Sequence, residues 1–476
     1  MKRRFTSAEG CPGCATSITR RGALRLASNG FGYLAFSALA AEEARAMPGP
    51  ILQPHFPPKA KNVILLFMPG GVSHMESFDP KPKLAELDGK PAKLDNYVAG
   101  PNRKWLRCLW RFQQYGQCGA PVSELFPHIA ACVDDLAIIR SMKSEFPLHA
   151  RGNVFLHTGR NIGGFPSIGS WIAYGLGSEN KNLPGYVLLR DASVPPGGIE
   201  NFANGFLPAS NQATHIRDEG DAVDNIKPAD KNERVQRAKL DALLQQDRQF
   251  LRATGGDDAI ESAIANYEMA YRMQSLVPDV LNLDRESEST RKLYGLDSDD
   301  KPKRQYGLQC LRARRLVEAG VRFVEVTCPN LFGMNGTWDQ HSGLRKDHEK
   351  NASVTDQAVA ALIKDLKSRG LLEQTLILWA GEFGRTPDTG NGDGRDHHPG
   401  CFTVWMAGGG IKGGVTYGET DDLGNQVARD PVTMHDLHAT ILHLLGLDHE
   451  KLTYRFGGRE QRLTDVHGHV VKAVIA

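Results

Sequence analysis

Residues 375–400 read TLILWAGEFGRTPDTGNGDGRDHHPG, and this stretch decides the fold. Residues 376–380 lack the polar alternation of a half-exposed strand, which is typical of a strand buried on both faces. Gly381 and Gly384 then allow the backbone to turn at the carboxyl end of that strand. Open α/β sheets bind their ligands at that edge. We therefore predict a functional site built from the polar residues that follow: Glu382, Arg385, Asp396, His397 and His398.

Helices that end at a glycine alternate with apolar strands on the N-terminal side of this stretch. A predicted helix over 308–319 leads into a strand over 321–327, and a helix over 355–369 leads into the strand over 375–380. Glycine directly after the last helical residue is the usual stop signal. Further elements are predicted as strands at 62–68, 136–140, 183–189 and 402–407 and a helix at 435–445. The chain is therefore predicted to be an α/β protein whose central, mostly parallel sheet is flanked by helices.

Most of the chain is expected to form one domain, residues 47–476. The 476 residues, 41% of them hydrophobic, can bury a large core. Apolar side chains at helical spacing predict a helical insertion at about 227–275. The same pattern also fits two ordinary surface helices of the core.

The first 46 residues have the chemistry of an export signal. Arg20 and Arg21 precede a moderately apolar run over 24–41, and Ala44-Arg45-Ala46 offers a cleavage site. Twin arginines indicate the Tat export machinery, so a periplasmic or secreted protein is expected. A disordered tail with a chance arginine pair is the alternative. No later run of about 18 apolar residues occurs, so no transmembrane segment is expected in the mature chain.

The net charge and the cysteines indicate which partners and which disulfides to expect. The formal net charge is +2, and the chain after residue 46 is near −2, which does not favour nucleic acid as a partner. Cys108 and Cys118 are the best candidates for a disulfide in an oxidising compartment. Cys328 and Cys401 lie in strand-like runs and are expected to be buried free thiols.

Three groups of histidines and carboxylates follow predicted strands or begin a predicted helix. The groups are Asp339 with His341, then Glu382 with Asp396, His397 and His398, and last His435 with Asp436 and His438. Imidazole and carboxylate together suit Zn²⁺, Mn²⁺ or Fe, whereas an all-oxygen site suits Ca²⁺ or Mg²⁺. A divalent metal is thus expected, with Zn, Mn or Ca as candidates. The third group is the weakest, because Asp436 can simply cap the helix that it begins.

Three arginines could hold an oxyanion through a bidentate guanidinium: Arg140, Arg160 and Arg385. For each of them a surface or structural role is the commoner alternative. Serine-hydrolase, nucleotide and dinucleotide readings lack support, because the chain has no Gly-x-Ser-x-Gly elbow, no Walker loop and no Gly-x-Gly-x-x-Gly after a strand.

The order of these motifs resembles the alkaline phosphatase and sulfatase superfamily. More closely, it resembles the bacterial family known as domain of unknown function 1501. The motifs that carry the resemblance are NVILLFMPGG (62–71), GGVSH (70–74), TLILWAGEFGRTP (375–387), GRDH (394–397), DLHATILHLLG (436–446) and LTDVHG (463–468).

The resemblance implies roles for named residues, with two departures. Where sulfatases carry metal-binding aspartates, this chain has Pro69, Gly70 and Gly71. Where sulfatases carry the cysteine that becomes formylglycine, it has His149, which excludes formylglycine chemistry. The implied metal ligands are Asp339, His341, Glu382 and His397. The implied nucleophile or base is His149 or Ser73, and the implied oxyanion clamp is Arg385 or Arg160.

The sequence therefore predicts an exported, metal-dependent hydrolase of phosphate or sulfate esters. The substrate is expected to be a small molecule or a polysaccharide ester. The alternative is a non-catalytic member with the same fold that acts in carbohydrate binding or envelope assembly.

Overall fold

The computed structural model describes residues 53–92, 102–191, 193–217, 223, 232–254, 258–332, 337–389 and 393–476. The predicted signal over residues 1–46 lies outside the described residues. Everything described here belongs to one compact unit, Pro50–Ala476.

The described strands build a nine-stranded sheet in the order β12-β4-β11-β8-β1-β7-β5-β6, with β15 also pairing with β4. These strands are β1 (Asn62–Phe67), β4 (Leu136–Lys143), β5 (Tyr186–Leu189), β6 (Thr214–Ile216), β7 (Phe323–Thr327), β8 (Thr375–Ala380), β11 (Phe402–Ala407), β12 (Val415–Tyr417) and β15 (Val432–Thr433). Strand β11 runs antiparallel to β4 and β8, and the other pairs of this sheet are parallel. The predicted α/β fold with a mostly parallel sheet is confirmed.

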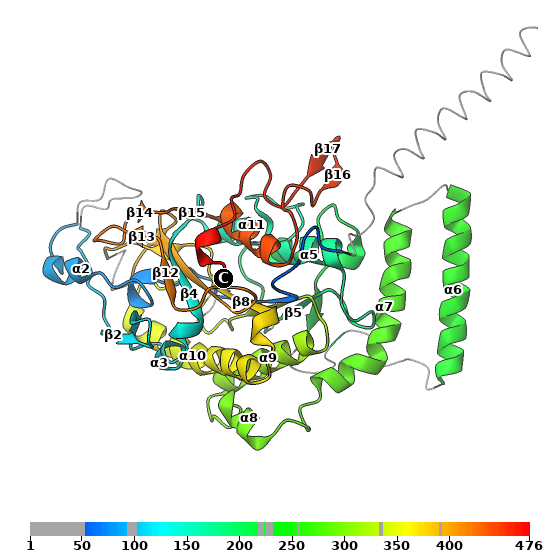
Figure 1. Cartoon of the computed structure of the whole chain (residues 1–476), viewed down its shortest axis with the longest axis horizontal. Helices are drawn as coiled ribbons and strands as arrows, with labels where there is room; N and C mark the ends of the chain where they lie inside the picture. Colours follow the sequence, from blue (N-terminus) through cyan, green and yellow to red (C-terminus); the bar gives the residue numbers. More distant parts are fainter. Residues whose placement is uncertain are drawn as a thin grey trace, which may run out of the picture. The chain divides into compact units, whose positions relative to one another are not determined.

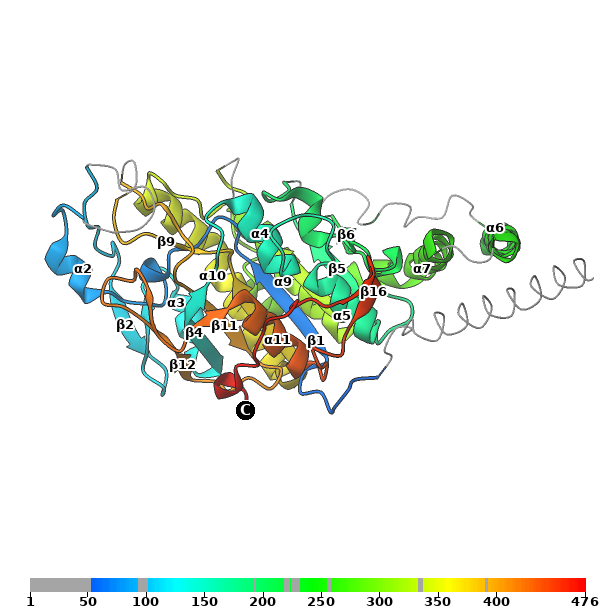
Figure 2. The same ribbon diagram turned by 90° about the horizontal axis from the view of Figure 1, so that it is seen from above.

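Helices cover both faces of the sheet (Figures 1 and 2). The helices are α2 (Pro82–Leu87), α3 (Pro127–Ala130), α4 (His149–Thr158), α5 (Ile168–Leu176), α6 (Glu233–Thr254), α7 (Asp258–Leu281), α8 (Glu288–Leu293), α9 (Lys301–Glu318), α10 (Leu344–Ser368) and α11 (Met434–Leu444). Short hairpins pair β2 (Phe112–Tyr115) with β3 (Ala120–Ser123), β9 (Gly384–Arg385) with β10 (His397–His398), β13 (Glu419–Thr420) with β14 (Val427–Arg429), and β16 (Tyr454–Phe456) with β17 (Arg459–Gln461).

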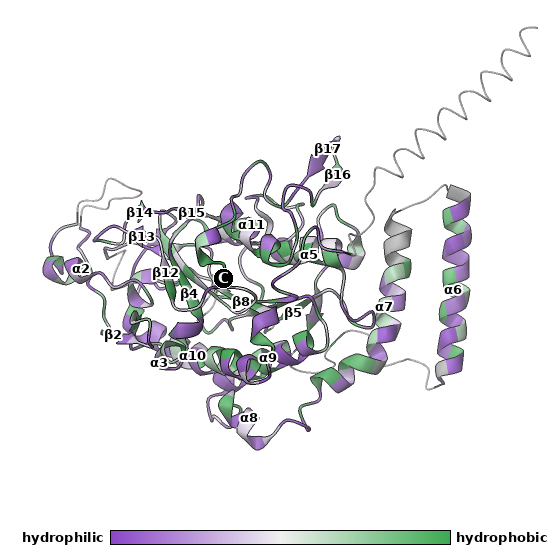
Figure 3. Ribbon diagram, in the orientation of Figure 1, coloured by the Kyte–Doolittle hydropathy of each residue, from purple (hydrophilic) through white to green (hydrophobic). Residues whose placement is uncertain are grey.

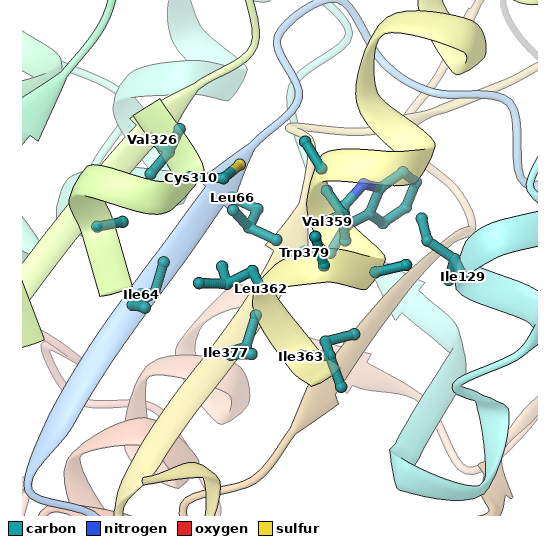
Figure 4. Close-up of a cluster of buried hydrophobic side chains, with 14 of the residues drawn as sticks. Ile64, Leu66, Ile129, Cys310, Val326, Val359, Leu362, Ile363, Ile377 and Trp379 are labelled. Atoms are coloured by element: carbon teal, nitrogen blue, oxygen red, sulfur yellow. The ribbon is translucent and has the colours of Figure 1, made fainter. Parts of the chain in front are cut away.

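Strand β1 divides its side chains between two hydrophobic cores. Ile64 and Leu66 pack with α9 and α10 on one face, where Figure 4 shows them beside Leu362 and Trp379. Their neighbours at 63, 65 and 67 pack with α4, α5 and α11 on the other face. Successive strand residues point to opposite faces, so an all-apolar strand is the sequence signature of a sheet covered on both sides.

Several helices differ from the sequence prediction. Helix α9 begins at Lys301 instead of residue 308, and the short helices α2, α3 and α8 were not predicted. Helix α10 begins at Leu344, well before the predicted start at residue 355. The prediction missed its first turns because they carry mostly polar residues without apolar spacing. Helix α5 was not predicted, since all nine of its residues are buried and no polar face marks its period. The predicted capping role of Asp436 is confirmed, because it forms a capping box with Thr433 at the start of α11.

Helices α6 and α7 fill the region where a helical insertion was expected. Arg237 of α6 pairs with Glu268 of α7 at 3.0 Å, and α7 continues onto the core, where Arg315 of α9 donates to the Val280 carbonyl at 2.6 Å. In Figure 3, α6 is mostly hydrophilic. No helix among the described residues has the length and apolarity that crossing a bilayer requires.

The predicted disulfide between Cys108 and Cys118 is wrong, since both thiols are free. The Cys108 thiol instead contacts the Trp110 carbonyl and the Cys118 thiol contacts the Tyr115 carbonyl. Cys328 and Cys401 are buried free thiols, as predicted.

Candidate metal centre

The site lies at the carboxyl edge of three neighbouring parallel strands. Strands β7 and β8 flank β1 in parallel register, so the loops that follow all three begin side by side. The loop after β7 carries Asp339 and His341, and the loop after β8 leads through β9 to β10, which carries His397. His149 is the first residue of α4. The fold therefore brings together residues that are far apart in the sequence.

Three imidazole nitrogens surround one carboxylate oxygen. Oδ1 of Asp339 lies 3.2 Å from Nε2 of His149, 3.0 Å from Nε2 of His341 and 3.1 Å from Nε2 of His397. Nε2 of His341 lies 3.0 Å from Nε2 of His397. His149 and Asp339 are almost fully buried, whereas 41% of the His341 side chain is exposed. The cluster therefore meets solvent on the His341 side.

Each of the three imidazoles is held through its other nitrogen. The Nδ1 contacts are His149 to Oε1 of Glu382 (2.5 Å), His341 to Oδ1 of Asp396 (2.8 Å) and His397 to the Pro147 carbonyl (2.7 Å). Ionised carboxylates and carbonyls only accept hydrogen bonds, so Nδ1 carries the proton in each ring. Each Nε2 faces Oδ1 of Asp339, where it can carry a second proton or bind a cation, and a ring held through Nδ1 in this way is how metal-binding histidines are oriented in proteins.

The electrostatics keep the cluster ready for a cation. Burial lowers the pKa of His397 to about 4, so this ring is neutral at neutral pH. Burial alone would raise the pKa of Asp339, but the three histidines and the charge of Arg385 hold it far below its usual range. Burial likewise opposes protonation of His149, yet Asp339 and Glu382 outweigh it and raise its pKa. Carboxylates that favour a proton at Nε2 also favour a metal ion there.

The donor atoms lie close enough to share one ion. Ligand atoms of His149, Asp339 and His397 all lie within 4.8 Å of one another, and they are the one group of this kind among the described residues. The cluster is therefore a possible site for a divalent metal.

Glu382, a predicted ligand, lies behind His149. Its carboxylate accepts the Nδ1 proton of His149 and two contacts from the Gly70 amide, at 3.0 and 3.2 Å, and it is fully buried. Gly152 of α4 leaves room for it, since a Cβ there would lie 3.2 Å from the Glu382 side chain. Glu382 thus orients His149.

Arg385, a predicted oxyanion clamp, is buried and joins three loops. Its guanidinium donates to the carbonyls of Gly71 (2.9 Å), Arg395 (3.0 Å), Trp338 (3.2 Å) and Gly70, and to Oδ1 of Asp339 (2.7 Å). Burial lowers its pKa. The Arg385 guanidinium is thus occupied by bonds within the protein, and it holds Asp339 in place.

Three other predicted residues are engaged with partners outside the cluster. The buried Ser73 hydroxyl donates to Glu76, whose carboxylate pairs with Arg395 at 2.7 Å. Arg160 pairs with Asp465 at 2.5 Å and lies over the Phe165 ring. The Arg140 Nε donates to the Phe78 carbonyl at 2.9 Å.

The third predicted histidine group has a structural role. Nε2 of His435 donates to the Gly159 carbonyl at 3.0 Å, and Nε2 of His438 donates to the Leu156 carbonyl at 2.7 Å. These bonds join α11 to α4. The same histidines are absent from the candidate metal group of the described residues.

Three residues support the site in roles that sequence reasoning did not assign: Asp396 and Gly70, which it had named, and Arg103, which it had not. Asp396 holds His341, and Arg103 pairs with Asp396 and, at 3.0 Å, with Asp388. The position of Asp396 directly before His397 is a usable signal, whereas Arg103 lies in a segment without periodicity. The third is Gly70, whose φ is +109° and where a Cβ would lie 2.7 Å from the amide nitrogens of Trp338 and Asp339.

Comparison with known proteins gives one family and several distant structures. The profile of the family described as "Protein of unknown function (DUF1501)" matches residues 60–475. No curated protein sequence matches the chain. The PsFucS1 sulfatase from Pseudoalteromonas sp. is 14% identical, with 86% of this chain and 72% of that chain covered and a TM-score of 0.37.

Two further solved structures are similarly distant. A magnesium-bound variant of the alkaline phosphatase from the Antarctic bacterium TAB5 is 10% identical, with coverages of 82% and 99% and a TM-score of 0.36. Ps i-CgsB, solved with k-i-k-neocarrahexaose, is 10% identical, with coverages of 82% and 72% and a TM-score of 0.36. Likenesses of this size say nothing about the activity of this chain.

Proposed function

The chain belongs to the family described as "Protein of unknown function (DUF1501)", and we propose that it is an exported, metal-dependent hydrolase of phosphate or sulfate esters. The observation that carries the proposal is the convergence of three imidazole Nε2 atoms on Oδ1 of Asp339, each ring being held through Nδ1. Imidazoles that are held through Nδ1 beside an ionised carboxylate are the donor set of catalytic metal sites.

In this proposal Asp339, His341 and His397 would hold the ion, as the family resemblance implies, and His149, which also lies within ligand distance of Asp339 and His397, serves as the base. Nitrogen donors outnumber oxygen donors, which favours Zn²⁺ or Mn²⁺ over Ca²⁺ among the expected metals. An ion bound there supplies a Lewis acid that polarises the phosphoryl or sulfuryl oxygen of the ester. The exposed edge of His341 is where the substrate enters.

His149 is the proposed general base. Its Nδ1 proton is committed to Glu382, so Nε2, which faces Oδ1 of Asp339 at 3.2 Å, is the atom that would take the proton from the attacking water. The water oxygen then bonds to phosphorus or sulfur as the bond to the ester oxygen breaks, and the proton taken up by His149 passes to the departing oxygen, so that the products are an alcohol and phosphate or sulfate. Ser73 is not used, because its hydroxyl is buried and bound to Glu76.

The substrate class and the location are parts of the same proposal. The substrate is a small-molecule or polysaccharide ester. The twin arginines at residues 20 and 21 support export by the Tat machinery to the periplasm or the medium.

The test combines elemental analysis with a screen of phosphate and sulfate esters on the purified full chain. We expect bound zinc or manganese and hydrolysis that a chelator removes and the metal restores. Metal-free protein that binds neither Zn²⁺ nor Mn²⁺ and hydrolyses none of the esters would overturn the proposal.

A non-catalytic role in carbohydrate binding or envelope assembly is the second candidate. It is favoured because Arg385, Arg160 and Ser73, which were expected to bind or attack the ester, are bonded to carboxylates of the protein instead. Metal binding without ester hydrolysis, together with binding of an oligosaccharide panel, would support it.

A further inference from the structure

A second histidine of α4 joins a fully buried polar group that the proposed reaction does not use. Nε2 of His157 lies 3.1 Å from Oε1 of Glu325 on β7, and the Tyr186 hydroxyl of β5 donates to Oε2 of the same carboxylate at 2.9 Å. The exposed fractions of these side chains are 0%, 0% and 1%. The rings of Phe67 and Phe202 meet the His157 ring edge-on and exclude water from it.

The group holds an extra proton in the core. Nδ1 of His157 donates to the Asn153 carbonyl at 2.7 Å, so Nε2 and Glu325 share a second proton between them. Burial opposes a charge on His157, but the Glu325 carboxylate outweighs it and raises the His157 pKa. Burial and Glu325 also raise the pKa of Tyr186, which therefore stays a donor.

Stability alone is a poor reason for such a group. Replacing a buried ion pair by apolar side chains of similar volume is often neutral or stabilising, whereas removing one partner is costly. What the pair provides is a directional bond with a fixed geometry. The relevant question is which part of the molecule that geometry fixes.

The answer lies in where the two bonds of α4 sit. His149 at the first position of the helix bonds to Glu382 after β8, and His157, about 12 Å further along the axis, bonds to Glu325 on β7. One histidine–carboxylate contact therefore ties each end of the helix to a different strand. The second contact sets the rotation and height of the helix on which His149 is carried.

We infer that His157, Glu325 and Tyr186 are positioning residues that fix α4 against the sheet and thereby aim the His149 imidazole, an inference that rests on the role proposed for His149. Without this group, the C-terminal half of α4 would keep its apolar packing and its bonds from His435 and His438 of α11, but it would lose its side-chain bond to the sheet. A displacement of about 1 Å at a catalytic group lowers the reaction rate strongly.

The deciding variant replaces the whole group by apolar side chains: His157→Leu, Glu325→Leu and Tyr186→Phe together. This leaves no buried partner unpaired, so the variant is expected to fold with a melting temperature close to that of the wild type. The matched control is Tyr294→Phe, which removes the buried bond from Tyr294 to Asp365 (3.1 Å), remote from α4 in the contacts it makes.

The primary readout is the imidazole N–H resonance of His149, recorded on ¹⁵N-histidine-labelled protein and assigned by its loss in His149→Gln. We expect it to shift or broaden in the triple variant and to stay unchanged in Tyr294→Phe. The N–H of His74, which donates to the Gly424 carbonyl at 3.0 Å, is the internal reference and should not move.

The second readout is ester hydrolysis. A kcat reduced about tenfold or more, with metal content and KM unchanged, is expected if the group aims His149. An unchanged His149 resonance and unchanged kcat in the folded variant would overturn the inference.

Two outcomes separate this inference from the proposed function. If the wild type binds no metal and hydrolyses no ester, the proposed function fails, while the resonance still decides whether the group positions His149. If the triple variant does not fold, Glu325→Gln, which keeps the shape and removes the charge, is measured against the same two outcomes.

Discussion

Nε2 of His341 lies 3.0 Å from Nε2 of His397, and both atoms face Oδ1 of Asp339. Because both rings are held through Nδ1, two Nε2 atoms and an anionic oxygen converge on one point. Two imidazole nitrogens approach this closely when a proton or a metal ion lies between them. The arrangement gives direct expectations for metal binding.

His397→Ala is expected to lower the affinity for Zn²⁺ by about 100-fold or more, because it removes a ligand directly. His149→Ala should retain most of the metal and lose ester hydrolysis, since His149 acts as the base. Metal affinity is measured by competition with a coloured chelator. His469→Ala, whose side chain is 94% exposed, is the control. Equal metal loss in all three variants would contradict the assignment.

The two carboxylates behind the histidines should have different effects. Asp396→Asn weakens the bond to a metal ligand, His341, and is expected to lower metal affinity about 10-fold to 100-fold. Glu382→Gln weakens the bond to the base, so kcat should fall while metal affinity changes little. The comparison of metal titrations with steady-state kinetics checks both. Exchanged effects would mean that His149 is the ligand and His341 is not.

Gly70→Ala should destabilise the protein by about 3 kcal/mol or more, because a Cβ there meets the backbone of the metal loop at a positive φ. Gly89→Ala shares the positive φ of +73° but has nothing within 4 Å. It should cost only about 1–2 kcal/mol. Urea unfolding of both variants separates the effect of the close backbone contact at Gly70 from that of the positive φ. Equal losses in the free energy of unfolding would show that the close contact does not contribute.

Buried neutral histidines should make the protein less stable in mild acid. Burial and then the charges of Arg385 and Arg395 lower the pKa of His348 from 6.5 to about 3, so the unfolded chain takes up a proton that the folded chain refuses. Stability therefore falls as pH drops below about 6.5, by about 1.4 kcal/mol per pH unit for this residue.

His348→Phe should reduce that pH dependence. Neither ring nitrogen of His348 has a hydrogen-bond partner among the described residues, so phenylalanine removes a titrating group without removing a bond. Between about pH 7 and pH 5 the variant should lose about 2 kcal/mol less than the wild type in urea unfolding. His469→Gln should follow the wild type. An unchanged slope in His348→Phe would show that His348 does not contribute.

The sheet was predictable because its strands carry their own signals. Strand β8 has the predicted bounds, since a run that is apolar at every position fits only a strand covered on both faces. Helix α5 was missed for the same physical reason, because a helix buried all round has no polar face to reveal its period. The spacing of apolar and polar residues reveals a helix only when one of its faces is polar, so a helix buried on all sides cannot be predicted from it.

The site was predictable in its residue types and less so in their roles. Asp339, His341 and His397 lie together, as the family resemblance implied and as their positions after neighbouring strands favoured. Whether Glu382 faces a metal or the far side of His149 depends on the height of α4 above the sheet, which no local pattern encodes. The burial of Arg385 likewise follows from three loops closing around it.

The convergence of three separate chain segments at Oδ1 of Asp339 has a kinetic consequence. Residues 149, 339, 341 and 397 are separated by up to about 190 residues between consecutive contributors, so no chain that ends before residue 397 can present the full set of donors. Tight capture of a metal ion is then a late event that reports completed folding. Bound metal would therefore distinguish fully folded molecules from those whose sheet is still incomplete.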